Sequence, residues 1–295
     1  MTDWSRVTRG VYRVRQHYRY TYTAPVWDIK QRLIMIPPEL GGDQRVLDHE
    51  LKVRGHEGET EVRWIRDEYG NRVANLKVPR VQRAVDFEAI FQVERDTART
   101  SALRPAPWLA FGGPSRFVHH TALTAPDERL WRAADEIHRA SKDARECAER
   151  AHDWASGIIT YLYGVTGYTT PAAMALHFQK GVCQDFAHIL LTVLRLLTIP
   201  CRYVSGHMLG EGAPHAWVEV LLADEDAPGR VEVIAYDPTH HRRARMDYIT
   251  IATGRDFADI TPTSGTYGGP AQGKLAYTKQ TEIVELNAPA PQSVA

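Results

Sequence analysis

The sequence predicts an α+β protein, because two kinds of apolar periodicity occupy its two halves. Residues 12–96 alternate apolar and polar side chains with period two, as strands with one buried face do. Residues 127–197 repeat their apolar positions with the period of helices, and further strand-like runs follow. With 295 residues, the chain is long enough for two domains of about 150 residues each.

Six short strands are expected before residue 96, with no helix between them. In the first, tyrosine and valine alternate with arginine, histidine and threonine, so its outer face is basic. Gly70 and Asn71 provide the turn for a hairpin between two of the later strands. A succession of this kind predicts an antiparallel β-sandwich of about 100 residues. The expected strands are 12–22, 33–36, 46–53, 61–66, 73–78 and 85–93.

Residues 103–126 are rich in proline and glycine, which suits a connection between domains. We therefore expect an all-β N-terminal domain over residues 1–110 and a second domain over residues 111–295. The second domain begins with helices, and its helix 184–197 is apolar around nearly its whole circumference, so it should be buried. The expected elements are helices 127–141, 144–162, a third beginning after Thr170, and 184–197, then strands 201–205, 215–222 and 231–236.

The charge balance and hydropathy of the chain exclude several classes of function. The 36 Lys and Arg residues balance 36 Asp and Glu residues, so the basic footprint of a nucleic-acid or anionic-membrane partner is missing. No stretch approaches the ~20 apolar residues that cross a bilayer, and the charged N-terminus has no apolar core of a secretory signal. We expect a cytoplasmic protein without nucleic-acid or membrane partners, and the sequence leaves its oligomeric state open.

The three cysteines differ in their surroundings. Three cysteines are too few for a disulfide framework, and an odd number cannot all pair; they also lack the paired spacing of a structural zinc site. We expect Cys147 and Cys201 to be small apolar residues of the core. Cys183 follows Gly181 and Val182 at the start of the apolar helix, where unpaired N–H groups and the helix dipole stabilise a thiolate. Cys183 is therefore a candidate nucleophile.

A histidine and an aspartate follow Cys183 in the order that thiol catalysis uses. His215 begins one expected strand and Asp237 ends the next. If these strands are adjacent and antiparallel, the two side chains can meet, and the start of the apolar helix can bring the Cys183 sulfur to the imidazole. Nucleophile, base and orienting carboxylate would then form a Cys-His-Asp triad.

The segments around these residues resemble the three motifs of the bacterial transglutaminase-like superfamily, a group of papain-like thiol enzymes. The motifs are Gly181 to His188, His215 to Val220 and Tyr236 to Thr239. Residues 199–206, 254–260 and 266–269 are similar to further segments of the family, and the first hundred residues resemble its N-terminal region. The resemblance implies a papain-like core, in which the nucleophile helix packs on an antiparallel sheet.

The resemblance also implies acyl transfer from an amide of a peptide or protein through a thioester, without metal or organic cofactor. Cys183 would attack the carbonyl carbon, His215 would move the proton, and Asp237 would hold the imidazole tautomer. Water as acceptor gives cysteine peptidase or amidase activity. A primary amine as acceptor gives transglutaminase or peptide-ligation activity. The sequence does not decide between water and an amine.

Further residues are candidates for the substrate pocket. The Cys183 backbone N–H would meet the oxyanion, and Gln184 is a second donor only by its adjacency. Trp217 and Tyr267 could wall the acyl cleft, with core packing as the alternative for each. Arg255 could bind a substrate carboxylate or pair with a neighbouring aspartate, Asp256 or Asp259.

The chain departs from the family pattern beside two motifs. Ala213 and Pro214 precede His215 where a serine is common, and His240 and His241 follow the third motif where an asparagine is common. We expect a solvated loop at these histidines rather than metal ligands. In the first motif, we expect Asp185 to brace the helix that starts at Cys183. We expect His188 to be a hydrogen-bonded histidine in the core.

Two other classes of function stay open from the sequence. One is a non-catalytic binding module on the same fold, which access to Cys183 would distinguish from an enzyme. The other is a metalloprotein that uses Cys183, His215 and Asp237 as ligands, since these residue types also bind zinc.

Overall fold

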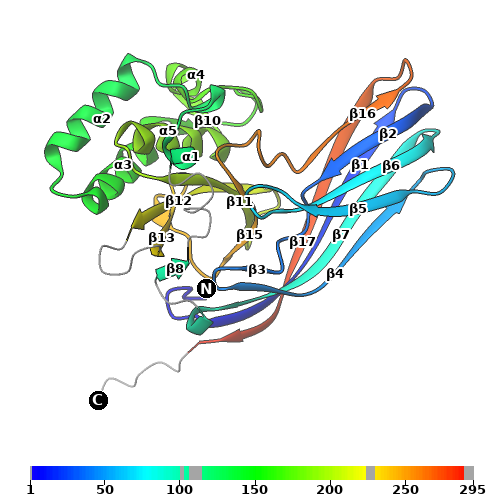
Figure 1. Ribbon diagram of the computed structural model, residues 1–295, viewed down its shortest axis with the longest axis horizontal. Helices are drawn as coiled ribbons and strands as arrows, with labels where there is room; N and C mark the ends of the chain where they lie inside the picture. Colours follow the sequence, from blue (N-terminus) through cyan, green and yellow to red (C-terminus); the bar gives the residue numbers. More distant parts are fainter. Residues whose placement is uncertain (1, 100–102, 106–114, 224–229, 289–295) are drawn as a thin grey trace.

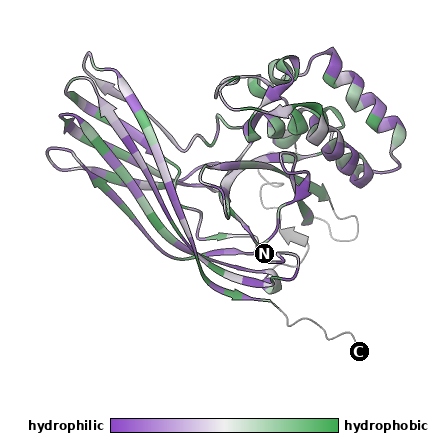
Figure 2. Ribbon diagram, turned by 180° about the vertical axis from the view of Figure 1, so that it is seen from behind, coloured by the Kyte–Doolittle hydropathy of each residue, from purple (hydrophilic) through white to green (hydrophobic). Residues whose placement is uncertain are grey.

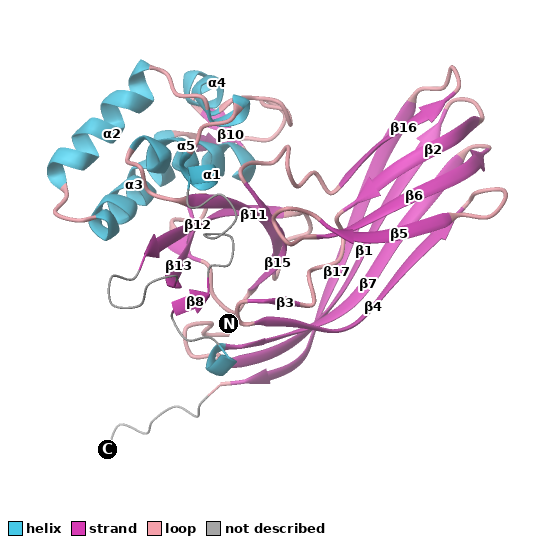
Figure 3. Ribbon diagram, in the orientation of Figure 1, coloured by secondary structure: helices cyan, strands magenta, loops and turns pink. Residues whose placement is uncertain are grey.

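The computed structural model describes residues 2–99, 103–105, 115–223 and 230–288 and confirms the α+β class. Its main sheets are antiparallel, and its helices gather at one end of the molecule, away from the long strands (Figures 1 and 3). Within the described ranges, no helix is both long and apolar enough to cross a membrane.

The long strands form a sandwich of two sheets, with orders β17-β1-β7-β4-β3 and β16-β2-β6-β5. Green and purple alternate along these strands in Figure 2, as the period-two pattern predicts. The inward side chains, including Tyr12, Phe87 and Phe91, form one core. The strands are β1 (Arg9–Tyr22), β2 (Val26–Leu33), β3 (Leu40–Gly41), β4 (Gln44–Arg54), β5 (Glu61–Arg66), β6 (Arg72–Val81), β7 (Ala84–Asp96), β16 (Thr263–Gly268) and β17 (Gly273–Asn287).

Two strands of this sandwich come from the end of the chain. β17 pairs antiparallel with β1 from Gly273 opposite Tyr22 to Asn287 opposite Arg9, and β16 pairs with β2. The expectation that residues 111–295 form a separate second domain is therefore wrong for residues 263–287. Pairing across the length of a chain leaves no local signal in the sequence, which explains the error. The expected boundary near residue 110 lies outside the described residues.

The other half is a sheet of order β14-β13-β12-β11-β15 that is covered by helices, with β8 paired to β13. The apolar helix α5 lies in the middle of its core, as expected. The helices are α1 (Ser115–Val118), α2 (Glu128–Ala140), α3 (Ala144–Ile158), α4 (Ala172–Phe178) and α5 (Cys183–Leu196), with 3₁₀ turns at Thr97–Arg99 and Ala122–Thr124. The strands are β8 (Leu103–Pro105), β9 (Thr160–Tyr161), β10 (Lys180–Gly181), β11 (Cys201–Met208), β12 (His215–Ala223), β13 (Arg230–Asp237), β14 (Arg242–Arg243) and β15 (Tyr248–Gly254).

The sandwich holds the edge strand β15 through two amide side chains. Gln44 donates to the Thr250 carbonyl at 2.8 Å and accepts from the Thr250 N–H at 3.0 Å. Asn71 makes the same pair of bonds with Thr253, both at 2.8 Å. These side chains satisfy backbone groups that β11, on the other side of β15, does not reach. The two halves are thus joined by hydrogen bonds as well as by apolar packing.

Replacing Asn71 by alanine should lower the free energy of unfolding by about 1–3 kcal/mol, because the partly buried Thr253 N–H and carbonyl lose their partner, the buried Asn71 side chain. Chemical denaturation of the purified protein measures this change. Asn287→Ala, at the exposed end of β17, is the matched control and should shift stability by less than ~0.5 kcal/mol. Equal effects of the two substitutions would contradict the role of Asn71.

Candidate active site

The structure brings Cys183, His215 and Asp237 together where α5 meets the sheet. Cys183 is the first residue of α5, His215 the first of β12 and Asp237 the last of β13. Because β12 and β13 are antiparallel neighbours, the start of one lies beside the end of the other. His215 Nε2 lies 2.7 Å from Asp237 Oδ2, and the Cys183 side chain hydrogen-bonds with His215.

The start of α5 is braced by Asp185, as expected. Its Oδ2 accepts from the Val182 N–H at 2.7 Å and from the Thr166 hydroxyl at 2.6 Å. The approach is so close that a Cβ on Gly181 would lie 2.6 Å from the Asp185 side chain. The glycine and aspartate of the first motif therefore fix the backbone that carries Cys183.

The carboxylate of Asp237 is fully buried and accepts five hydrogen bonds. Oδ2 accepts from His215, from His240 Nδ1 at 2.8 Å and from the Tyr248 hydroxyl at 2.6 Å. Oδ1 accepts from the N–H groups of Thr239 and His240 at 2.9 and 3.3 Å. Burial alone would raise the pKa of Asp237, but these donors hold it well below its usual range. The group is therefore a fixed negative charge.

His215 is held in its protonated form. Burial opposes the charge, but the hydrogen bonds and charges of Asp237 and Cys183 outweigh it and raise the pKa of His215 to about 10. Because Nε2 faces Asp237, Nδ1 is the nitrogen left for the sulfur. An imidazolium beside a thiol stabilises the thiolate, which is the nucleophilic form.

The expected aromatic residues do not both lie at the site. Trp217 is 1% exposed and lies under the imidazole of His215, with ring centroids 6.3 Å apart. A Cβ on Gly206 would lie 2.6 Å from its indole, so the glycine makes room for this packing. Tyr267 lies on β16, and its ring packs against Tyr22 with centroids 5.1 Å apart. The strand β16 belongs to the sandwich, away from the helices (Figure 1). Core packing therefore describes Trp217, and the structure does not place Tyr267 in a cleft wall.

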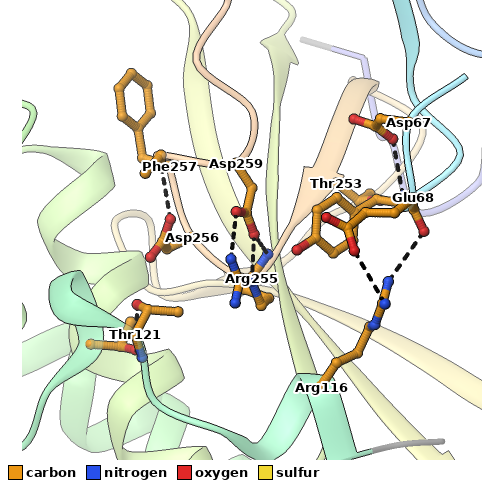
Figure 4. Close-up of polar contacts among 12 residues, drawn as sticks. Asp67, Glu68, Arg116, Thr121, Thr253, Arg255, Asp256, Phe257 and Asp259 are labelled. Atoms are coloured by element: carbon orange, nitrogen blue, oxygen red, sulfur yellow. Dashed lines mark hydrogen bonds and ion pairs between the residues drawn. The ribbon is translucent and has the colours of Figure 1, made fainter. Parts of the chain in front are cut away.

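The two expected polar pocket residues already have partners. Gln184 is buried, and its amide donates to the Tyr168 carbonyl at 3.3 Å. Arg255 holds Asp259 with two side-chain bonds of 2.9 Å, and its backbone N–H donates to the same carboxylate (Figure 4). The structure thus gives Arg255 the ion pair that was the alternative to binding a substrate carboxylate.

Two residues of the site, Glu211 and Tyr248, are not predicted from the sequence, and a third, His240, lies elsewhere than the sequence predicts. Glu211, in the connection before β12, has a carboxylate oxygen 3.7 Å from His215 Nδ1. Tyr248 is the first residue of β15, and its hydroxyl donates to Asp237. In the sheet, β12 and β11 lie between β15 and β13, which carries Asp237. The sequence predicts a solvated loop for His240, but its side chain contacts both Asp237 and Glu211. In the sequence, only its position three residues after Asp237 indicates that His240 could contact that carboxylate.

The other two thiols and the first-motif histidine are buried. Cys147 and Cys201 are buried, and burial raises the pKa of Cys201 to about 11. His188 is fully buried, as expected, and burial lowers its pKa to about 3, so it stays neutral. Cys183 is the partly exposed member of the three cysteines. These burial differences favour Cys183 as the reactive thiol.

Comparison with known proteins places the chain in a family. The description "Transglutaminase-like superfamily" matches residues 132–230, and "Bacterial transglutaminase-like N-terminal region" matches residues 12–94. An uncharacterized protein of Mycobacterium leprae (strain TN) is 30% identical over 208 residues, which cover 66% of this chain and 71% of that protein. An uncharacterized protein of Mycobacterium tuberculosis (strain ATCC 25618 / H37Rv) is 29% identical over 276 residues, 86% of each.

The protein belongs to the transglutaminase-like superfamily, with the bacterial N-terminal region of that family. A solved structure shows the same fold: a candidate cysteine protease from Cytophaga hutchinsonii, with a TM-score of 0.74 and 20% sequence identity. The match covers 95% of this chain and 93% of that one.

The rate at which iodoacetamide alkylates Cys183 should change less than about threefold between pH 6.5 and 9. The reason is that His215, with its pKa raised to about 10, stays charged across this range beside the Cys183 sulfur. In His215→Gln the rate should rise about tenfold per pH unit, as for an ordinary thiol below its pKa of about 8.5. Mass spectrometry of the digested protein follows each cysteine separately.

Cys147 and Cys201 are internal controls and should stay unmodified in the folded protein, because both are buried. A wild-type rate that rises in parallel with that of His215→Gln would contradict the raised pKa of His215. Equal labelling of all three cysteines would contradict the assignment of Cys183.

Proposed function

We propose that this protein is a thiol-dependent acyl-transfer enzyme that acts on amide bonds of peptides or proteins. The observation that carries the proposal is the hydrogen-bonded series from the Cys183 thiol through His215 to the buried carboxylate of Asp237. The hydrogen bond between the Cys183 side chain and His215 supports nucleophilic attack without a metal.

In the proposed reaction, the Cys183 sulfur attacks the amide carbonyl carbon and forms a tetrahedral oxyanion. The imidazolium of His215 then gives its Nδ1 proton to the leaving amine as the C–N bond breaks, which leaves a thioester. Water or an amine attacks the thioester, and neutral His215 accepts its proton as the C–S bond breaks. Asp237 holds the imidazole in place throughout. Backbone N–H groups at the start of α5 are the proposed donors to the oxyanion.

The surface beside the thiol supports a peptide as the substrate. Tyr161 of β9 pairs with Gly181 of β10, two residues before Cys183. The neighbouring side chains of Leu162, Tyr163 and Tyr168 are exposed, although large apolar side chains are usually buried. We propose that these residues contact apolar side chains of an extended peptide on one side of the scissile bond.

A panel of peptides and glutamine donors, incubated with and without a primary amine, tests the proposal. The wild-type protein should release peptide fragments if water is the acceptor. If an amine is the acceptor, the product should lose ammonia and gain the mass of the amine. Cys183→Ala should lower kcat/KM by at least ~10³-fold, because it removes the nucleophile.

Cys147→Ala is the matched control, since it removes a buried thiol away from His215 and should retain activity. Turnover by Cys183→Ala at the wild-type rate would contradict the proposed chemistry. A lack of turnover on every substrate, together with a Cys183 that does not react with alkylating agents, would favour the binding-module alternative.

A further inference from the structure

A second group of potential ligands faces the catalytic imidazole. Glu211, His215 and His240 each offer one ligand atom, and these atoms lie within 4.8 Å of one another. One Glu211 oxygen is 3.1 Å from His240 Nε2, and the other is 3.7 Å from His215 Nδ1. His215 is buried, whereas Glu211 and His240 are each 33% exposed, so the group is open to solvent on one side.

Both imidazoles are oriented by one shared carboxylate. Asp237 Oδ2 accepts from His215 Nε2 and from His240 Nδ1, so the remaining nitrogen of each ring faces Glu211. Metal-binding histidines characteristically donate their second N–H to a carboxylate, which fixes the tautomer and the direction of the ring. Here a single buried carboxylate does so for two rings, which preorganises them for a common ion.

We propose that Glu211, His215 and His240 bind one zinc-like divalent cation, with the Cys183 thiolate or water in the fourth position. Zinc lies about 2.0–2.2 Å from nitrogen and oxygen ligands, so tetrahedral ligand atoms are about 3.3 Å apart. The three ligand atoms lie within 4.8 Å of one another, so small rotations of the partly exposed Glu211 and His240 side chains would bring them to that spacing. Two imidazole nitrogens and one carboxylate suit zinc, whereas Mg²⁺ and Ca²⁺ prefer oxygen ligands.

The ligand set differs from the metalloprotein alternative that the sequence suggested. That alternative made Asp237 a ligand, but both of its oxygens already accept hydrogen bonds. Asp237 instead lies behind the two histidines, and His240, where the family pattern has an asparagine, supplies the additional ligand.

The bound cation would inhibit the reaction of the Cys183 thiol. It takes the place of the proton on His215 Nδ1, the nitrogen that faces Cys183, and the proton is released to solvent. Without that proton His215 has none to give to a leaving amine, and a metal-bound sulfur is a weaker nucleophile. The site rests on geometry alone, and only this inhibitory effect depends on the proposed function.

Zinc titration of the chelator-treated, full-length protein tests the site without any substrate. A chromophoric chelator in competition measures zinc binding, and the rate of Cys183 alkylation with and without zinc measures protection of the thiol. In the wild type we expect one bound zinc and alkylation slowed at least about tenfold at saturation.

His240→Asn and Glu211→Gln should each raise the half-protecting zinc concentration at least about tenfold. Asparagine can still donate to Asp237, and Glu211 is partly exposed, so at least one of the two variants should fold. His241→Asn is the matched control and should stay within about twofold of the wild type. His241 belongs to a separate group with His152 and Asp153, in which His241 and Asp153 are 61% and 66% exposed.

Three results would overturn the site. In the first, both variants keep protection at wild-type zinc concentrations, which would place the ion on the thiol alone. In the second, His241→Asn loses more protection than His240→Asn or Glu211→Gln. In the third, the wild-type thiol is not protected at 1 mM zinc. Zinc protection in a protein without turnover would support the site and contradict the proposed enzyme, so the two claims fail separately.

Discussion

The buried carboxylate of Asp237 is the constraint on which the site depends. A charge with no exposure to solvent is stable only when donors surround it, and here the donors come from three different elements. His215 is the first residue of β12, His240 follows β13, and Tyr248 starts β15. Any shift among these elements would leave the carboxylate short of a partner. The same hydrogen bonds orient His215 for Cys183 and orient His240 toward Glu211.

The sandwich contributes to this arrangement through β15. Tyr248, which donates to Asp237, lies in a strand whose backbone is held by Gln44 and Asn71. Arg95 of β7 adds a bond of 2.6 Å to the Tyr248 carbonyl. The N-terminal half therefore supports the site from behind, and β17, returning to pair with β1, completes the sheet that carries Arg95.

Local patterns predict most of the strands, the buried helix and the order of Cys183, His215 and Asp237, because each depends on nearby residues. The strand expected at 33–36 is wrong, because β2 spans Val26–Leu33 and ends where that strand should begin. They do not predict the strands that return from the C-terminus, since pairing between residues more than 200 positions apart leaves no local trace. They also leave the aromatic residues ambiguous, because a core and a cleft wall both use them, as Trp217 shows. His240 is visible in the sequence, but only the fold shows that it shares a carboxylate with His215.

The most direct test of this account is the titration of the His215 ring by nuclear magnetic resonance in the metal-free protein. The ring should stay protonated up to a pH near 10, because Asp237 and Cys183 raise the pKa of His215 to about 10. In Asp237→Asn the ring should lose its proton at a lower pH. A wild-type His215 that titrates near pH 6.5, the ordinary value for histidine, would contradict the account.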